Sequence, residues 1–220
     1  MQLIDIPTEQ TTAATDLLLA AVAAAAAVSM WNWRGNDRRR AALWAWAFGL
    51  LGFAAVLGAA AHGLRMSTAA NRLIWMPLNL ALGLVMALFV AGAVYDRFGL
   101  AAARRALPIL LAIGMTFFAV AELSDGGFLV FVIYEAIAML TALVLYGLLA
   151  LHRRLAGAAT VVIGVLITIA AAAVQVNHNV RVNVIWEFDH NGIFHLMQIA
   201  GVIVIAAGLR PARDQHRRLG

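Results

Sequence analysis

The sequence contains no cysteine and no lysine among its 220 residues. Without cysteine the chain forms no disulfide bond and no thiolate metal site, so any metal ligand must be histidine or an oxygen donor. Without lysine it forms no Schiff base, which excludes a retinal photoreceptor. Charged residues make up only 12% of the chain, against roughly 25% in soluble domains. The low content of charged residues indicates a protein whose surface is largely apolar.

Apolar residues take the place of the missing charge. They account for 64% of the chain, and the mean hydropathy is +0.87. Seven apolar runs are each long enough to cross about 30 Å of hydrocarbon as a helix. We therefore predict an all-α, polytopic membrane protein in which residues 1–220 form one seven-helix domain that ends in a basic cytoplasmic tail at 210–220. The predicted helices cover residues 15–33, 41–64, 73–95, 106–123, 128–151, 158–176 and 190–209.

All sixteen basic residues are arginine, and their distribution predicts the orientation of the chain. Thirteen follow the first, third, fifth and seventh runs, whereas Arg65, Arg72 and Arg181 lie on the other side. Because cytoplasmic flanks of membrane helices are rich in arginine, we expect an extracytoplasmic N-terminus and a cytoplasmic C-terminus. The same flanks explain the pI near 10.9, so no nucleic-acid partner is required.

The composition also predicts an address for the protein. Abundant alanine and arginine, with no lysine or cysteine, is typical of a high-GC bacterial genome. We therefore expect a multi-pass protein of the bacterial inner membrane, with membrane lipid and a lipid-like substrate as its partners. The sequence does not predict an oligomeric state.

Polar side chains gather in the extracytoplasmic half of the predicted helices. Such groups are costly in a bilayer and usually face the bundle interior, where they mark a site. Glu135 is deep in its run, where an unpaired carboxylate costs on the order of 3 kcal/mol, so we expect it to be protonated, paired or functional. His178 is expected to be a solvated residue of the polar loop N-H-N-V-R-V-N. The polar residues of this half are His62, Asn79, Glu122, Glu135, Gln175, His178, Asp189, His190, Asn191, His195 and Gln198.

The seventh run opens with the densest group of these residues, F-D-H-N-G-I-F-H-L-M-Q. Residues three and four apart share a helix face, so Asn191, His195 and Gln198 are predicted to form one polar stripe. His190 stands about 140° away from His195 on an ideal helix. The two histidines can therefore share an ion only if His190 lies at or before the helix start, for which Asp189 is a suitable N-cap.

These residues resemble the motif of the CREST superfamily, which includes the alkaline ceramidases and the progestin and adipoQ receptors. Its members are seven-helix membrane proteins with S-x3-H in the second helix, Asp in the third and H-x3-H in the seventh. His62 and His195 match two of those histidines, whereas Gly58, Asn79 and Asn191 replace the serine, the aspartate and the other histidine. The segment H-N-G-I-F-H-L-M-Q is also similar to uncharacterised bacterial seven-helix proteins related to that group.

The resemblance implies a zinc-dependent hydrolase that acts on a lipid amide or ester at the extracytoplasmic side. His62 and His195 would supply two ligands, and catalytic zinc usually takes a third from the protein. The third ligand is open between His190, Glu135 and Glu122. A set of two histidines and one carboxylate would also accept iron or manganese.

Three residues are candidate catalytic groups under the same resemblance. Glu135 or Asp189 would act as the general base toward a metal-activated water. Asn79 stands where the family has its aspartate. Whether the chain is an enzyme at all is open at this point.

Other readings of the same residues are not enzymatic. In one, His62, Asn79, Asn191 and His195 form a metal-free hydrogen-bond network in a bundle that binds a lipid or small ligand, or acts as a receptor. A proton-coupled carrier would use Glu135 and the histidines, but polar residues confined to one half of the bilayer do not make a complete path. Haem held between His62 and His195 is a further alternative.

Overall fold

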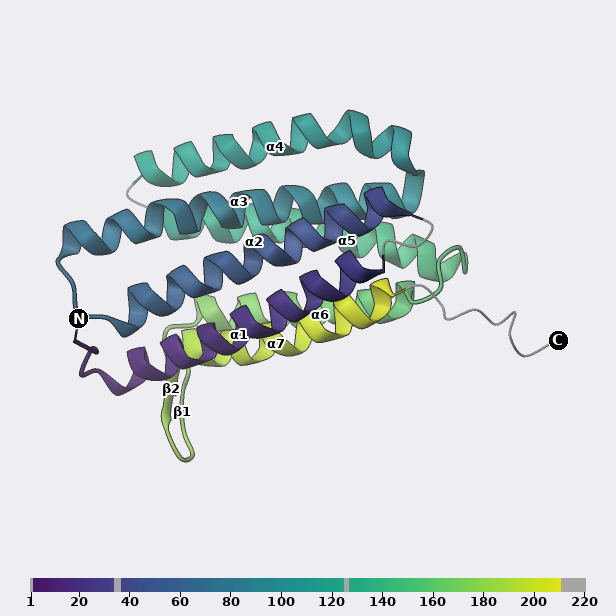
Figure 1. The fold of residues 1–220 in the computed structure, drawn as a ribbon. Coiled ribbons are helices and arrows are strands. Elements are labelled where there is room, and N and C mark those ends of the chain that lie inside the picture. The colour runs from purple at the N-terminus through teal and green to yellow at the C-terminus, as the bar shows by residue number, and fades with distance from the viewer. Residues whose placement is uncertain (1, 34–36, 125–126, 211–220) are drawn as a thin grey trace.

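The computed structural model describes residues 2–33, 37–124 and 127–210, and these form seven α-helices and one small β-hairpin (Figure 1). All seven described helices are long and apolar enough to cross a membrane, which confirms the predicted helical fold and indicates a multi-pass membrane protein. Apart from its first residue, the predicted tail lies outside the described residues. The helices are α1 Pro7–Asn32, α2 Arg38–Gly63, α3 Thr68–Phe98, α4 Leu100–Leu123, α5 Gly127–Leu151, α6 Ala158–Val176 and α7 His190–Leu209.

Three helices begin five or more residues earlier than the hydrophobic runs predict. Helices α6 and α7 have the predicted bounds, but α1, α3 and α4 begin before residues 15, 73 and 106, so those predicted starts are wrong. A hydrophobic run marks only the lipid-crossing part of a helix, whereas its backbone hydrogen bonds continue into polar flanking sequence. Pro7 occupies the first turn of α1, where its missing N–H has no intrahelical partner to lose. Ser67 caps α3 by accepting a hydrogen bond of 3.2 Å from the backbone N–H of Ala70.

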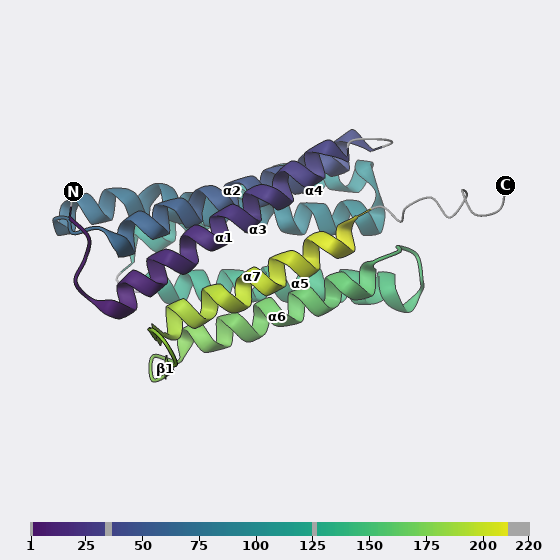
Figure 2. The ribbon, with the colours of Figure 1, turned by 60° about the horizontal axis from the view of Figure 1, so that its bottom comes forward.

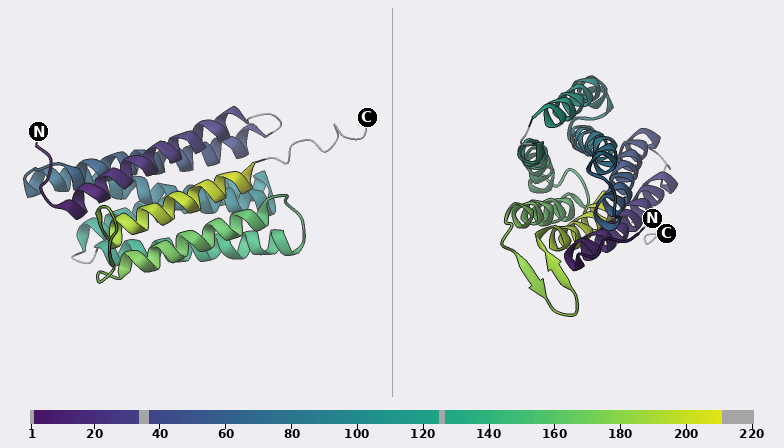
Figure 3. Two further views of the ribbon diagram at one scale, coloured as in Figure 1. Left: turned by 90° about the horizontal axis from the view of Figure 1, so that it is seen from below. Right: turned by 90° about the vertical axis from the view of Figure 1, so that its left-hand side faces the viewer.

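Among the described residues, six helices form a closed ring in the order α1, α2, α3, α5, α6, α7 and back to α1. Figure 3 shows the ring from one end, with α4 outside it against α3 and α5. Helix α1 closes the ring because it packs on both α2 and α7 (Figure 2). Side chains that face inward from any of these six helices can therefore meet.

The two ends of the ring differ. At one end the chain between α6 and α7 forms an antiparallel hairpin of β1 (Arg181–Asn183) and β2 (Glu187–Asp189), where the sequence predicts only a polar loop. The hairpin projects sideways from the helices (Figures 1 and 3). We call this the hairpin end, and α1, α3, α5 and α7 begin there. The opposite, arginine-rich end carries most of the described arginines, Arg38–Arg40 and Arg153–Arg154 among them.

The arginine-rich half of the ring is filled by apolar side chains. Trp44 is fully buried and meets Phe89 edge-on, with ring centroids 5.2 Å apart. Its indole lies directly against Gly92, where an added Cβ would be 2.5 Å from a ring carbon. Tyr146 and Val161 are likewise fully buried in the same core. This packing closes one half of the bundle.

A buried ionic group lies in the same half. Arg40 donates to both carboxylate oxygens of Asp96, from Nε at 2.5 Å and from Nη2 at 2.9 Å. The Tyr146 hydroxyl donates to Asp96 Oδ2 at 2.6 Å, and Arg40 Nη1 donates to the backbone carbonyl of Leu209 at 3.0 Å. We call these four partners the Arg40 cluster. The Asp96 carboxylate, which is 1% exposed, joins α2, α3 and α5, and the Arg40 guanidinium adds α7 through Leu209.

Helices α6 and α7 approach each other along glycines. A Cβ added to Gly164 would lie 2.6 Å from Ile205 Cγ1 and 2.8 Å from the backbone nitrogen of Ile205. One added to Gly201 would lie 2.7 Å from the Thr168 hydroxyl, and one added to Gly208 would lie 2.8 Å from the backbone nitrogen of Val161. Small residues at a helix interface allow such close approach in lipid. We call Gly164, Gly201 and Gly208 the α6–α7 glycine seam.

Candidate functional site

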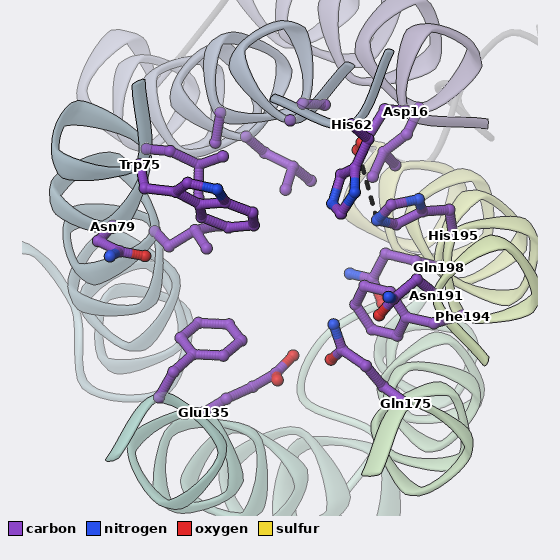
Figure 4. A pocket seen from close by; sticks show the side chains of 18 of the residues that line it. Asp16, His62, Trp75, Asn79, Glu135, Gln175, Asn191, Phe194, His195 and Gln198 are labelled. Carbon is purple, nitrogen blue, oxygen red and sulfur yellow. Dashed lines mark ion pairs between the residues drawn. The ribbon is translucent and has the colours of Figure 1, made fainter. Parts of the chain in front are cut away.

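The hairpin half of the ring encloses a cavity of about 440 Å³, within the size range of ligand sites. All six ring helices line it, and α4 contributes none of its lining residues. Figure 4 shows the polar side chains pointing into it from several walls. The lining residues are Asp16, Leu19, Leu51, Ala54, Ala55, Gly58, His62, Trp75, Leu78, Asn79, Leu82, Met86, Phe131, Glu135, Gln175, His178, His190, Asn191, Phe194, His195 and Gln198.

His195 is held by two partners from α1. Its Nε2 lies 3.4 Å from Asp16 Oδ1, and its Nδ1 lies 3.2 Å from the Thr15 hydroxyl oxygen. The Thr15 hydroxyl also bonds to backbone carbonyls of its own helix, and Thr15 is not a lining residue. This row of hydroxyl, imidazole and carboxylate therefore orients the ring and does not present a nucleophile to the cavity. Asp16 Oδ2 is buried and has no hydrogen-bond partner.

His62 lies on the same side of the cavity as this pair (Figure 4). Its Nδ1 is 2.7 Å from Glu9 Oε2, and its ring meets Trp75 edge-on at 5.6 Å between centroids. Gly58, one turn earlier on α2, makes room for Asp16, because a Cβ there would lie 2.7 Å from Asp16 Oδ2. The position that carries serine in the resembled motif is thus filled here by a carboxylate from α1.

The opposite wall presents Glu135 of α5 (Figure 4). Glu135 is 3% exposed, and its Oε2 has no hydrogen-bond partner. Asn191, His195 and Gln198 all line the cavity from one face of α7, so the predicted polar stripe is confirmed. Carboxylate, imidazole and amide groups therefore face one another across a mostly apolar interior.

The exposed His178 and the half-buried His190 stand at the hairpin end, where the cavity meets the outside. Their Nδ1 and Nε2 atoms are 3.0 Å apart, so His178 is solvated as expected but also faces another histidine. Asp189 caps α7, as predicted: its Oδ1 accepts hydrogen bonds of 3.0 Å from two backbone N–H groups and one of 3.1 Å from the Thr12 hydroxyl. Asp189 is not among the lining residues, and it holds the helix start and α1 together.

Asn79 connects the cavity to a neighbouring pocket between α3 and α4. Its Nδ2 donates to Glu122 Oε1 at 3.0 Å. This second pocket, of about 430 Å³, shares Asn79 and Trp75 with the cavity and is lined by Arg72 and Glu122. Glu122 does not line the main cavity, so it is separated from His62 and His195.

The three predicted metal ligands are not gathered into one group. His62 and His195 lie near the same wall, whereas His190 faces His178 at the mouth. Among the residues that the structure describes, no group of three or more His, Asp and Glu side chains is arranged to hold a metal ion. Zinc, iron or manganese at this site stays a prediction.

Sequence reasoning missed the acidic partners from α1. Asp16 was placed at the edge of a helix starting at residue 15, but α1 starts at Pro7, which moves Asp16 about two turns inside it. Glu9 belongs to the added turns and pairs with His62. Proline before a threonine and an acidic residue is a helix-start signal, and it would have extended the helix. No local sequence signal indicates that Asp16 contacts His195, because α1 and α7 are far apart in the sequence and come together only in the folded chain.

Comparison with known proteins matches residues 11–214 to a family described as a family of unknown function, DUF6962. No curated protein and no solved structure matches the chain. The match covers most of the chain, including the cavity residues of every ring helix.

Proposed function

Since the chain belongs to this family of unknown function, membership assigns no chemistry, and we propose from the cavity itself that the protein binds an amphipathic, lipid-like molecule. The proposal rests on one observation: a cavity inside a bundle of helices that are long and apolar enough to cross a membrane is lined by several polar side chains and, farthest from the hairpin end, by the apolar Leu51, Leu82 and Met86. Such a lining fits a molecule with one polar group and one chain.

The depth of the cavity supports this reading. His62 ends the polar part of the α2 wall, while Leu51 lines the cavity eleven positions earlier on the same helix. At 1.5 Å per residue these side chains are separated by about 16 Å along the axis. Met86 and Leu82 extend the apolar part on α3. The length suits a polar group near the mouth with an acyl chain below it.

The sidedness of the site follows from the arginines. Cytoplasmic flanks are rich in arginine, so the arginine-rich end would face the cytoplasm and the hairpin end would lie outside. The cavity would then draw its ligand from the outer leaflet or the extracytoplasmic space. The composition supports a bacterial inner membrane as the compartment.

Photolabelling tests this proposal. A monoacylglycerol with a diazirine in its chain, added to the full-length protein in nanodiscs, is expected to label Leu82 and Met86 inside the cavity. Asn191→Trp places a bulky ring on the cavity wall, so we expect severalfold less labelling of both residues. Mass spectrometry of the labelled peptides measures the change.

A matched variant makes the result specific. Ile203→Trp adds the same ring to the same helix at a position that is 51% exposed, and it should leave interior labelling unchanged. Ile133 and Ile137 on the outer face of α5 should be labelled in every version, since they are 53% and 60% exposed. Labels confined to such outward residues would show that the cavity takes no acyl chain.

Metal-dependent hydrolysis of a lipid amide or ester is a second candidate, favoured by the carboxylate of Asp16 lying beside His195 with His62 nearby (Figure 4). Imidazole and carboxylate are suitable donors for zinc, iron or manganese. As they stand, the described side chains form no group of three for one ion, so we derive no step through a metal. A bound metal ion would supply activation of water and polarisation of the carbonyl.

Elemental analysis separates the second candidate from the first. If the protein is a metal hydrolase, purified protein should hold about one zinc, iron or manganese ion per chain, and both His62→Ala and His195→Ala should lose most of it. His152→Ala, at the arginine-rich end, should keep the metal. Protein that stays metal-free after incubation with all three ions would rule this candidate out and leave the binding function.

A further inference from the structure

The cavity holds buried oxygen atoms without partners. In the described part of the chain, the buried side-chain oxygens that lack a hydrogen-bond partner belong to Asp16, Glu135, Gln175 and Gln198. All four residues line the cavity. The two buried nitrogens without partners, in Trp44 and Arg97, belong to residues outside this lining. The unmet hydrogen-bonding capacity of the cavity is therefore on the acceptor side.

Buried polar atoms in folded proteins are almost always hydrogen-bonded, so four such oxygens around one space indicate a missing donor. Two of them are carboxylate oxygens on residues that are each 3% exposed, Asp16 and Glu135. The two amides could turn over, but a carboxylate presents oxygen in either orientation. The argument therefore depends on the two acids.

The charge around these acids is only partly balanced. No arginine is among the lining residues. The histidines that face the cavity do not balance the two acids fully. His62 pairs with Glu9 instead. His195 lies beside Asp16 Oδ1, and Asp16 Oδ2 has no hydrogen-bond partner. Glu135 has no ion-pair partner among the described residues. A buried carboxylate without a counter-charge is unfavourable, and a cationic ligand would remove that cost.

The remaining walls also suit a cation. Trp75 lies beside Asn79 on the α3 wall, and Phe194 lies on the α7 side (Figure 4). Phe131, one turn before Glu135 on α5, also lines the cavity. Aromatic faces attract ammonium groups, more strongly when water is excluded. Asp16 and Glu135 lie on opposite walls of the cavity, and both side chains face its interior (Figure 4).

Building on the proposed function, we propose that the ligand of this cavity is a cationic amphiphile, an alkyl chain that carries a donor-bearing ammonium group. The ammonium lies between the Asp16 and Glu135 carboxylates and donates to their unpartnered oxygens. The alkyl chain extends along Leu51, Leu82 and Met86 toward the filled half of the ring. An anionic or neutral head group would leave the same carboxylate oxygens without a positively charged donor.

Probes that share a decyl chain and differ in head group test this proposal. Decylammonium, decanoate and decanol are titrated at neutral pH into the full-length protein in non-ionic maltoside micelles. Each is read by its shift of the melting temperature and by its protection of Met86 from the diazirine monoacylglycerol. We expect decylammonium to protect at a concentration about tenfold lower than the others, or less. The preference should fall about tenfold in Glu135→Gln and in Asp16→Asn.

Glu122→Gln is the matched control, because it neutralises a carboxylate in the neighbouring pocket; it should keep the full preference for decylammonium. Equal protection by decanol or decanoate would overturn the cationic ligand and leave the proposed function standing. No protection by any probe, together with no interior labelling, would overturn both. If a variant fails to fold, the comparison of the three probes on the unaltered protein still decides.

Discussion

Replacing Asp96 with leucine is expected to lower the free energy of unfolding by about 3–5 kcal/mol, the largest effect of any single change considered for this protein. The substitution leaves the Arg40 guanidinium and the Tyr146 hydroxyl without their shared acceptor, in a place where Asp96 is 1% exposed and Arg40 19%. A buried cation that loses its partner keeps its desolvation cost and gains nothing. Equilibrium unfolding in mixed micelles, followed by tryptophan fluorescence, measures the loss.

Two further variants separate burial from charge. Arg40→Met combined with Asp96→Leu should cost less than Asp96→Leu alone, because it removes the uncompensated cation as well. Asp5→Leu breaks another aspartate–arginine pair, with Arg65, whose side chains are 76% and 53% exposed, and should change stability by less than about 1 kcal/mol. A cost for Asp96→Leu as small as that of Asp5→Leu would mean that water reaches the Arg40 cluster.

Gly164→Ala is expected to destabilise the bundle by about 1–3 kcal/mol through a single added methyl group. That methyl would lie 2.6 Å from a side-chain carbon and 2.8 Å from a backbone nitrogen of Ile205. The backbone atom cannot turn aside, so α6 and α7 must separate along the α6–α7 glycine seam. The separation would loosen the wall that carries Gln175, His195 and Gln198. The same unfolding assay measures the effect.

Gly147→Ala is the matched control for this prediction. Gly147 is also inside a helix, α5, but an added Cβ there meets nothing within 4 Å. Alanine is a better helix former than glycine by up to about 1 kcal/mol, so Gly147→Ala should leave stability unchanged or raise it. Only Gly164→Ala is thus expected to lower stability. A loss of stability for both would mean that helix flexibility matters here more than the contact at Ile205.

The helices could be predicted from the sequence because the bilayer imposes their length. Each crossing needs about 20 apolar residues, and a chain with seven such runs leaves few alternatives. The starts of α1, α3 and α4 could not be predicted in the same way. The hydrophobic run covers only the part of a helix that can lie in lipid, whereas these helices continue into the polar sequence before it. Pro7 and the Ser67 cap carry that information locally, in residues outside the hydrophobic runs.

The site could be predicted in part for a similar reason. Helical periodicity places Asn191, His195 and Gln198 on one face, and the cost of polar groups in lipid directs that face inward. The same cost pointed to Glu135, which is buried in the cavity wall. Asp16 could not be assigned to the site, because it meets His195 only through the contact of α1 with α7.

Asp189 shows the opposite difficulty. Its position beside the histidines suggested a catalytic base, whereas its Oδ1 accepts hydrogen bonds from the first turn of α7 and from Thr12. Local sequence correctly indicated the cap, whereas the role of general base stays a prediction for a residue that is not among those lining the cavity.

The filled half of the ring makes the cavity one-sided. Trp44 and its neighbours occupy the space between the cavity floor and the arginine-rich end, and the Arg40 cluster ties four ring helices together there. If the proposed ligand enters near His178 and His190, it must therefore leave at the same end of the ring. Passage from one face of the membrane to the other would first require the Asp96 carboxylate to let go of Arg40.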